Sequence, residues 1–199
     1  IWKLAAELGV PRMVFVNKLD RERASFPRVL EQLRDRFGAG IPPLELPSGE
    51  QAASRRVADL LTDTAFTYDT GSAVQGEIPD EMEAQEHEVH DNLVEGIVVA
   101  DDELLEGYLE GRVPSFEALE HTLAHGVAGA QVFPVVCGSA SADVAIDRLA
   151  DFICEIGPSP QDRPPVEVSA GDGTTEVAQI YDFDVLDLSV APPDEQRGA

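Results

Sequence analysis

The residues best suited to chemistry in this sequence belong to a short polar motif that directly follows an apolar segment. The motif is Asn17-Lys18-Leu19-Asp20, and the apolar segment runs from Met13 to Val16. Guanine presents two neighbouring donors, N1–H and the 2-amino group, and one carboxylate can accept both in a charge-assisted, bidentate pair. Asp20 is therefore a candidate for reading guanine. Lys18 can lay its aliphatic stem along the flat base, and the Asn17 amide can hold neighbouring loops in place.

The same motif has a purely structural interpretation. Asn17 and Asp20 are common turn-forming residues, and Asp20 could cap a following helix while still reading a base. The apolar run before the motif is typical of a buried parallel strand. Lysine is rare, with Lys3 and Lys18 set against twelve arginines, and this rarity favours a specific role for Lys18.

A second apolar segment, Gln131–Val136, leads into the small residues Cys137-Gly138-Ser139-Ala140. Small residues let the main chain approach a base closely, so Ser139 and Ala140 are candidates for contacting guanine O6 through their N–H groups. Because Pro134 cannot donate to a sheet ladder, we expect this strand at an edge of the sheet. The carboxyl ends of parallel strands meet at one edge, so both motifs should lie there together.

Hydrophobic periodicity predicts alternating strands and helices, which indicates an α/β fold with a parallel sheet and crossover helices. The predicted helices cover about 2–8, 23–37, 79–100, 101–110, a segment capped by Ser115, and 142–156. A strand is expected at 41–46. The 79–100 helix should bury Met82, Val89, Leu93 and Ile97, and the 142–156 helix should bury Ile146, Leu149 and Ile153.

Five segments match a known family in the same order along the chain: Pro11–Arg21, Ala24-x-Phe26, Leu104–Gly111, Phe133–Ala140 and Pro158–Pro160. On these segments the sequence resembles elongation factor G, the translocation GTPase of the bacterial ribosome, and a paralogue of that factor fits as well as the housekeeping protein. The match is loose between Leu46 and Glu77, and the Gly that this family has in the turn after Ser-Ala is missing here.

The resemblance implies part of a P-loop GTPase-type parallel sheet with helices, together with an α+β inserted subdomain. Residues 1–160 would form the C-terminal part of a GTP-binding domain, with the insertion at about 41–130 and short strands within 57–68. Residues 161–199 would be a linker and a truncated or degraded start of a β-barrel domain. The implied ligands are GTP and GDP, held by Asn17, Lys18, Asp20, Ser139 and Ala140.

Two motifs that GTP hydrolysis requires do not occur in the sequence. There is no Gly-x-x-x-x-Gly-Lys-Ser/Thr phosphate loop, and no Asp-x-x-Gly precedes Asn17. These elements position the phosphates, the magnesium ion and the attacking water. We therefore expect that the upstream half of the domain is cut away. This chain should hold no catalytic residue and should not hydrolyse GTP alone. Mg²⁺ is expected to bind only in the full-length protein.

The charge distribution indicates which kinds of partner this chain could bind. The net charge is −24, and the segment Val57–Gly111 contains sixteen acidic residues and no Lys or Arg. This sign excludes a direct nucleic-acid patch. The resemblance implies the ribosome as partner, with an acidic helix near 79–100 docking on the stalk protein; plain solubility explains the acidic surface equally well. In that helix the acidic residues expected mostly on exposed arcs are Glu81, Glu83, Glu86, Glu88 and Glu95.

Other features of the sequence argue against a membrane span and a metal site. No apolar run approaches the roughly 20 residues of a membrane span, and we expect a cytoplasmic protein. Cys137 and Cys154 lack metal-ligand spacing. The four histidines are expected to lie on helix surfaces without binding metal; they are His87, His90, His121 and His125.

Three interpretations stay open. The first is an elongation factor G-like GTPase acting in translocation. The second is another ribosomal GTPase, of the tetracycline-resistance protection or release-factor recycling type. The third is a non-enzymatic acidic remnant or interaction module.

Overall fold

The computed structural model describes residues 1–48, 55–69, 73–159, 166–169 and 175–178, with main chain alone at positions 81, 83, 84 and 88 and in the last two segments. The chain forms two compact units, Ile1–Gly157 and Pro158–Ala199. The helices are α1 (Trp2–Glu7), α2 (Phe26–Phe37), α3 (Asp80–Val98), α4 (Asp102–Leu109), α5 (Phe116–Ala128) and α6 (Ile146–Ile156). The strands are β1 (Val14–Val16), β2 (Glu45–Ser48), β3 (Arg56–Asp59), β4 (Thr64–Thr67), β5 (Val74–Gly76), β6 (Val135–Cys137), β7 (Val166–Ser169) and β8 (Thr175–Ala178).

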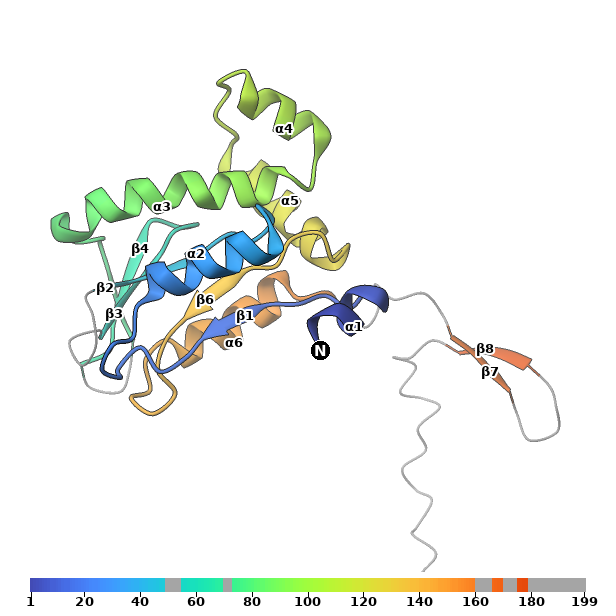
Figure 1. Ribbon diagram of the computed structural model, residues 1–199, viewed down its shortest axis with the longest axis horizontal. Helices are drawn as coiled ribbons and strands as arrows, with labels where there is room; N and C mark the ends of the chain where they lie inside the picture. The colour runs from blue at the N-terminus through green and yellow to red at the C-terminus, as the bar shows by residue number, and fades with distance from the viewer. Residues whose placement is uncertain (49–54, 70–72, 160–165, 170–174, 179–199) are drawn as a thin grey trace, which may run out of the picture. The chain divides into compact units, whose positions relative to one another are not determined.

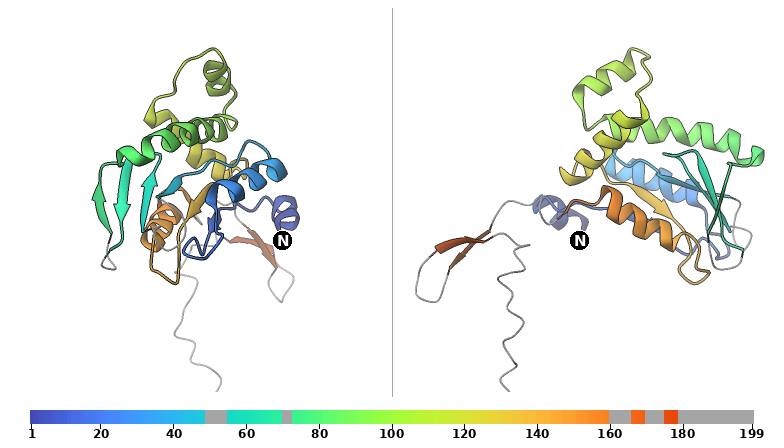
Figure 2. Two further views of the ribbon diagram at one scale, coloured as in Figure 1. Left: turned by 60° about the vertical axis from the view of Figure 1, so that its left-hand side comes forward. Right: turned by 180° about the vertical axis from the view of Figure 1, so that it is seen from behind.

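A parallel pair of strands lies at the centre of the first unit. β1 and β6 pair in parallel, with Val14 opposite Val135 and Val16 opposite Cys137. Helices α2 and α6 lie on opposite sides of this pair, as the front and back views show (Figures 1 and 2). Parallel strands need crossover connections, and helices that cover both faces are the usual result. The predicted α/β class is confirmed.

The segment between α2 and β6 builds a second sheet. Strands β2, β3, β4 and β5 form an antiparallel sheet in chain order, and α3 packs against it (Figure 1). The short strands expected within 57–68 are present as β3 and β4. This sheet joins the parallel pair through the segment that enters β2, because the Leu44 N–H donates to the Val135 carbonyl and the Val135 N–H to the Pro42 carbonyl.

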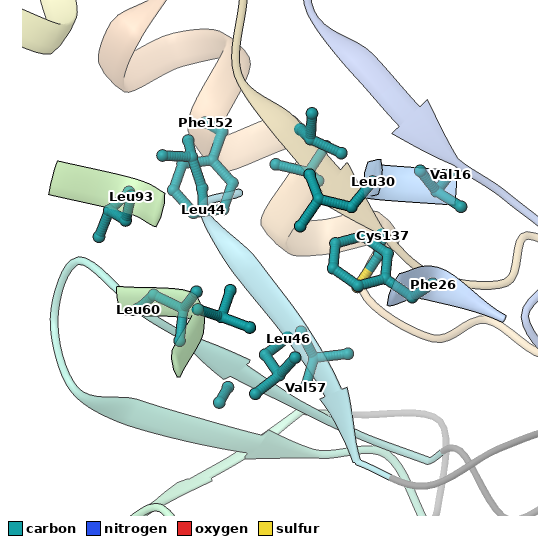
Figure 3. Close-up of a cluster of buried hydrophobic side chains, with 14 of the residues drawn as sticks. Val16, Phe26, Leu30, Leu44, Leu46, Val57, Leu60, Leu93, Cys137 and Phe152 are labelled. Atoms are coloured by element: carbon teal, nitrogen blue, oxygen red, sulfur yellow. The ribbon is translucent and has the colours of Figure 1, made fainter. Parts of the chain in front are cut away.

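One hydrophobic core serves both sheets. Leu44, Leu60, Leu93, Ile97 and Phe152 are fully or almost fully buried and come from four different parts of the chain. Figure 3 shows Leu44, Leu93 and Phe152 in one cluster with Val16 and Leu30. All four core residues predicted for the 79–100 helix are buried. Shared burial of this kind couples the position of β6 to the packing of α3.

Two helix starts are fixed by side chains. Asp101 accepts a hydrogen bond from the Leu104 N–H at 2.9 Å at the start of α4, and the predicted cap Ser115 accepts from the Ala118 N–H at 3.3 Å at the start of α5. Such caps satisfy donors that have no partner inside the helix. The residue before α2 is Ser25, so the expectation that Asp20 could cap this helix is wrong.

The expected edge position of the strand at 131–136 is also wrong. The strand is shorter, Val135–Cys137. It is flanked on one side by β1 and on the other by the segment that contains Pro42 and Leu44. Pro134 is tolerated because it precedes the strand, where its carbonyl still accepts from the Val14 N–H at 2.8 Å.

Two burial predictions fail because polar residues take buried places. On α6, Ile153 is 55% exposed, whereas Arg148, Phe152 and Ile156 form the buried face. On α3, Glu86 was expected on an exposed arc but is only 9% exposed. Glu95 is exposed as expected, and the side chains of Glu81, Glu83 and Glu88 lie outside the described part of the structure.

In the second unit the structure describes one antiparallel pair. β7 and β8 pair with Val166 opposite Ala178. The strand expected from Val177 overlaps the end of β8. The predicted linker before Val166 and the divergent stretch 182–199 lie outside the described residues.

Candidate functional site

The two sequence motifs meet at the carboxyl end of the parallel pair. The Gly138 N–H donates to the Val16 carbonyl at 3.1 Å, and the Leu19 N–H donates to the Gly138 carbonyl at 3.3 Å. A Cβ built on Gly138 would collide with the Val144 carbonyl oxygen in the same loop after β6. Glycine is therefore required for this loop to fold back on itself as it leaves β6.

Asp20 is held by hydroxyl groups from the loop after β6. The Ser139 hydroxyl donates to Asp20 Oδ1 at 2.5 Å, and the Ser141 hydroxyl donates to Oδ2 at 3.3 Å. Arg21 Nε lies 3.6 Å from Oδ2. The hydrogen bond from Ser139 lowers the pKa of the Asp20 carboxyl below its ordinary value. Asp20 is therefore an anion at neutral pH, and its side chain keeps 26% of its surface open to solvent.

Asn17 ties the two loops together, as the motif predicted. Its Oδ1 accepts from the Lys18 N–H at 2.7 Å and from the Ala140 N–H at 3.0 Å. The Ser139 N–H donates to the Val144 carbonyl at 3.0 Å. Both main-chain donors that were expected to face guanine O6 thus have partners within the protein, and O6 would have to share the Ala140 N–H with Asn17.

Lys18 has an unusual backbone conformation. Its φ is 66°, in the left-handed region, and the residue is exposed. A non-glycine residue in a sparsely populated region costs on the order of 1–3 kcal/mol, and such residues cluster at functional sites; five other non-glycine residues among those described also have positive φ. The conformation turns the chain sharply between Asn17 and Asp20, so that both side chains reach the loop after β6.

The loop after β6 is a tight hairpin that ends at α6. Ser139 and Val144 form an isolated antiparallel bridge. Asp143 and Ala145 have φ values of 54° and 58°. The turn therefore forms here with two non-glycine residues in the left-handed conformation.

Glu45, which the sequence reasoning missed, supports β6, the strand that leads into the loop with Ser139. Its Oε2 accepts from the Cys137 N–H at 2.7 Å, and the residue is 1% exposed. Burial raises the pKa of the Glu45 carboxyl to about 8; the Cys137 hydrogen bond opposes this shift and the charge of Asp59 adds to it. The available signal was one acidic residue in an otherwise apolar run, Ile41–Leu46.

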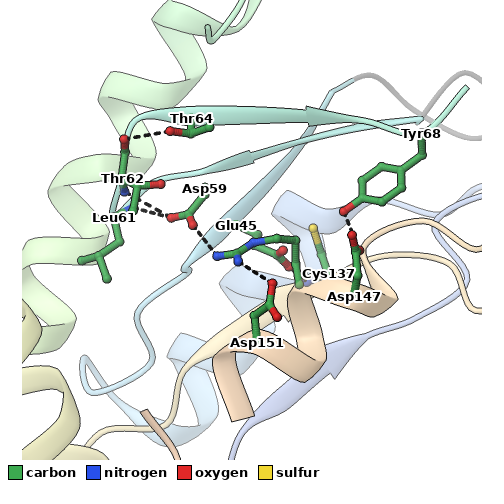
Figure 4. Close-up of polar contacts among 10 residues, drawn as sticks. Glu45, Asp59, Leu61, Thr62, Thr64, Tyr68, Cys137, Asp147 and Asp151 are labelled. Atoms are coloured by element: carbon green, nitrogen blue, oxygen red, sulfur yellow. Dashed lines mark hydrogen bonds and ion pairs between the residues drawn. The ribbon is translucent and has the colours of Figure 1, made fainter. Parts of the chain in front are cut away.

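An ion-pair network beside Glu45 links the antiparallel sheet to α6 (Figure 4). Arg148 donates to Asp59 Oδ2 at 2.7 Å and to Asp151 Oδ2 at 2.8 Å. Asp59 Oδ1 accepts from the Leu61 N–H at 2.9 Å and the Thr62 N–H at 3.2 Å. Close by, the Tyr68 hydroxyl donates to Asp147 Oδ1 at 2.8 Å. The network fixes the antiparallel sheet against α6 and hence against the loop that α6 follows.

The parallel pair, its flanking helices and its polar carboxyl edge place the chain in the class of parallel α/β folds that bind ligands at that edge. Within this class the family is shown by sequence. The chain belongs to the family of the elongation factor Tu GTP binding domain, whose model matches residues 1–159.

Relatives of known name support this assignment. Elongation factor G of Mycoplasma pneumoniae is 34% identical over 185 residues, which is 92% of this chain and 27% of the relative. Elongation factor G of Mycoplasma genitalium is 32% identical over 170 residues, 84% of this chain and 25% of the relative. A crystal structure of a protein from Thermus thermophilus superposes with a TM-score of 0.71 at 33% identity, covering 82% of this chain and 25% of that one. The chain spans about a quarter of the length of these relatives.

The helices also bear on membrane crossing. Of those that the structure describes, none combines the length and the apolar character that a membrane crossing requires.

Proposed function

We propose that this chain supplies the guanine-reading half of an elongation factor G-like translational GTPase that acts on the ribosome in translocation. The observation that carries the proposal is the joint held by Asp20 and Asn17. Ser139 binds Asp20 at 2.5 Å and the Ala140 N–H binds Asn17 at 3.0 Å. The two loops that would surround a guanine base are therefore already fixed to each other.

Each site residue has a distinct part in this proposal. The Asp20 carboxylate accepts guanine N1–H and the 2-amino group, and adenine offers no such pair of donors. Lys18 covers one face of the base with its aliphatic stem. Ser139 orients the Asp20 carboxylate, Asn17 holds the loop, and the Ala140 N–H is shared between Asn17 and guanine O6.

The ligands of this half-site are GTP and GDP. Nothing in the sequence has the pattern of a phosphate loop, so the residues present fit a base and leave the phosphates and Mg²⁺ to other segments of the full-length protein. We expect the chain alone not to release phosphate from GTP. Magnesium-dependent turnover by the purified chain would contradict this expectation.

The remaining assignments follow the same family. Residues about 41–130 are assigned to the inserted subdomain, and residues 161–199 to a linker and a truncated or degraded start of a β-barrel domain. The protein works in the cytoplasm. Helix α3 offers the stalk protein its acidic surface, in which Glu95 is exposed but already pairs with Arg34 at 2.9 Å, whereas Glu86 is buried and takes no part. Binding to the stalk should weaken steeply with salt, because the proposed contact is electrostatic.

A change of base preference tests the proposal. The protein to use is a chimera in which residues 1–159 replace the matching segment of the M. pneumoniae elongation factor G. In it, Asp20→Asn should weaken GDP at least tenfold and improve binding of xanthosine diphosphate. The reason is that an asparagine amide can donate to the 2-oxo group of xanthine, where guanine carries an amine.

Asp35→Asn, a change of the same kind at an exposed position of α2, is the matched control and should leave both affinities unchanged. Calorimetric titration with the two diphosphates measures the preference. If Asp20→Asn keeps the original preference for guanine, Asp20 does not read the base.

A further inference from the structure

A second cluster of ionisable side chains lies away from the guanine site, where the turn before β4 meets α3. Asp63 comes from the turn, and Glu86 and His90 come from α3 at positions i and i+4. One ligand atom from each of the three lies within 4.8 Å of the others. Residues four apart share one face of a helix, so Glu86 and His90 present their side chains to the turn together.

The cluster contains buried polar groups without adequate partners. Glu86 is only 9% exposed. Its carboxylate oxygens lie 3.5 Å from His90 Nδ1 and 3.6 Å from His87 Nδ1, which is too long for good hydrogen bonds. His90 Nδ1 is itself shielded from solvent and has no hydrogen-bond partner. Buried polar atoms without partners cost free energy, so this arrangement calls for a ligand between them.

The sequence around the cluster supplies no basic side chain to neutralise the carboxylates. The whole segment Val57–Gly111, which contains all three residues, has no Lys or Arg. An open hollow of about 510 Å³ is lined by Asp63, Ile78, Glu86, His87 and His90 and gives a small cation a path to the cluster.

We propose that Asp63, Glu86 and His90 bind a divalent transition-metal ion of the zinc type. Zinc takes imidazole nitrogen and carboxylate oxygen as ligands at about 2.0–2.2 Å, which sets tetrahedral ligand atoms roughly 3.3 Å apart. The ligand atoms, now within 4.8 Å of one another, would move closer through side-chain rotation of exposed Asp63 and half-buried His90. Water would complete the coordination. Two carboxylates balance the charge of the ion, and the imidazole nitrogen disfavours magnesium and calcium, which prefer all-oxygen sites.

A bound ion would tie the turn between β3 and β4 to α3. Both elements belong to the antiparallel sheet and its covering helix, whereas the residues assigned to guanine lie at the carboxyl end of the parallel pair. Metal binding at this cluster is therefore independent of the proposed guanine site and can be measured without nucleotide.

The test is metal titration of the purified 199-residue chain after treatment with a chelator. Calorimetry with Zn²⁺ should give one strong site per chain, and Co²⁺ should give the visible absorption bands of a low-coordinate N/O site. Glu86→Gln, His90→Gln and Asp63→Asn should each weaken Zn²⁺ binding at least tenfold, because losing even a partner outside the coordination sphere costs about 10–100-fold. Asp63 is exposed, so its variant reports on the site even if the α3 variants fold poorly.

Two other places could bind Zn²⁺ and need controls. His121 and His125 lie one turn apart on α5, with ring centroids 4.4 Å apart, and Cys154 is an exposed free thiol. Glu120→Gln and His121→Gln repeat the same changes on another helix, and Cys154→Ser removes the thiol. All three should leave the strong site intact. The proposal is overturned if the chain binds no Zn²⁺ tightly, or if binding is lost with His121 or Cys154 and kept without Glu86 and His90.

Discussion

Two polar clusters in the same compact unit differ in how much water they meet. Asp20 keeps 26% of its side-chain surface exposed and is held by the neutral hydroxyls of Ser139 and Ser141. Asp59 is 2% exposed and is paired with the guanidinium of Arg148, itself 11% exposed. The buried carboxylate is neutralised by the structure, whereas the exposed one keeps its charge and part of its surface available. Of these two carboxylates, only the exposed Asp20 is available to a ligand.

The largest effect is expected from breaking the buried pair. Arg148→Met should lower the free energy of unfolding by about 3–5 kcal/mol, because it leaves Asp59 buried and without its cation. The measurement is urea unfolding at neutral pH. Arg112, which pairs with Glu110 at 2.8 Å with both side chains well exposed, supplies the control, and Arg112→Ala should cost no more than about 1 kcal/mol. Equal losses in the two variants would show that burial does not distinguish these pairs.

A second effect should appear as a change in pH dependence. The folded-state pKa of Glu45 is about 8, above its unfolded value, so the unfolded carboxyl loses its proton first as pH rises. The stability contribution of protonated Glu45 is therefore complete below the unfolded pKa and declines as pH rises towards 8. Glu45→Gln should remove this decline, which amounts to on the order of a few kcal/mol between pH 5 and 8.

Thermal unfolding across this pH range measures the Glu45 effect. Glu117→Gln, an exposed change in the first turn of α5, serves as the control and should keep the wild-type slope. A Glu45→Gln profile that still falls as steeply as the wild type would assign the decline to another group.

The smallest effect concerns the exposed cluster. Ser139→Ala removes the hydrogen bond that contributes most to the lowered pKa of Asp20, so this pKa should rise towards its ordinary value. Ser141→Ala should move it less, because the Ser141 contact is 3.3 Å long whereas the Ser139 contact is 2.5 Å. The pKa of Asp20 in each variant is measured by following its carboxyl chemical shift by NMR as a function of pH. The reverse order of the two variants would mean that Ser141, rather than Ser139, holds the carboxylate.

Part of this architecture could be predicted from local sequence. The approach of Asn17 and Asp20 to Ser139 follows from two apolar runs that end in polar motifs, since parallel strands end at a common edge. The cap at Ser115 and the buried residues of α3 likewise follow from spacing alone. These features depend on periodicity and on residues close together in the chain.

The rest depends on contacts between distant segments. Apolar periodicity placed Ile153 inside, but α6 turns Arg148 inward, where it meets Asp59 and lies over the Phe66 and Phe152 rings at 4.9 and 4.6 Å. Glu45 and Glu86 were likewise assigned no buried role. From sequence alone a charged residue is predicted to be exposed. Its burial can be predicted only when its partner from another element is known, because charged residues are rarely buried unless they are paired.

The hydrogen bond between Glu45 and the Cys137 N–H also has a consequence for how the chain acquires its fold. It joins residues 92 positions apart, and contacts of such separation form slowly because a long loop must close first. During synthesis β2 is made before β6, so the Glu45 carboxyl gains its main-chain donor only after residues 46–137 have been made. The hydrogen bond that anchors β6 to β2 therefore cannot form in a chain that stops short of Cys137.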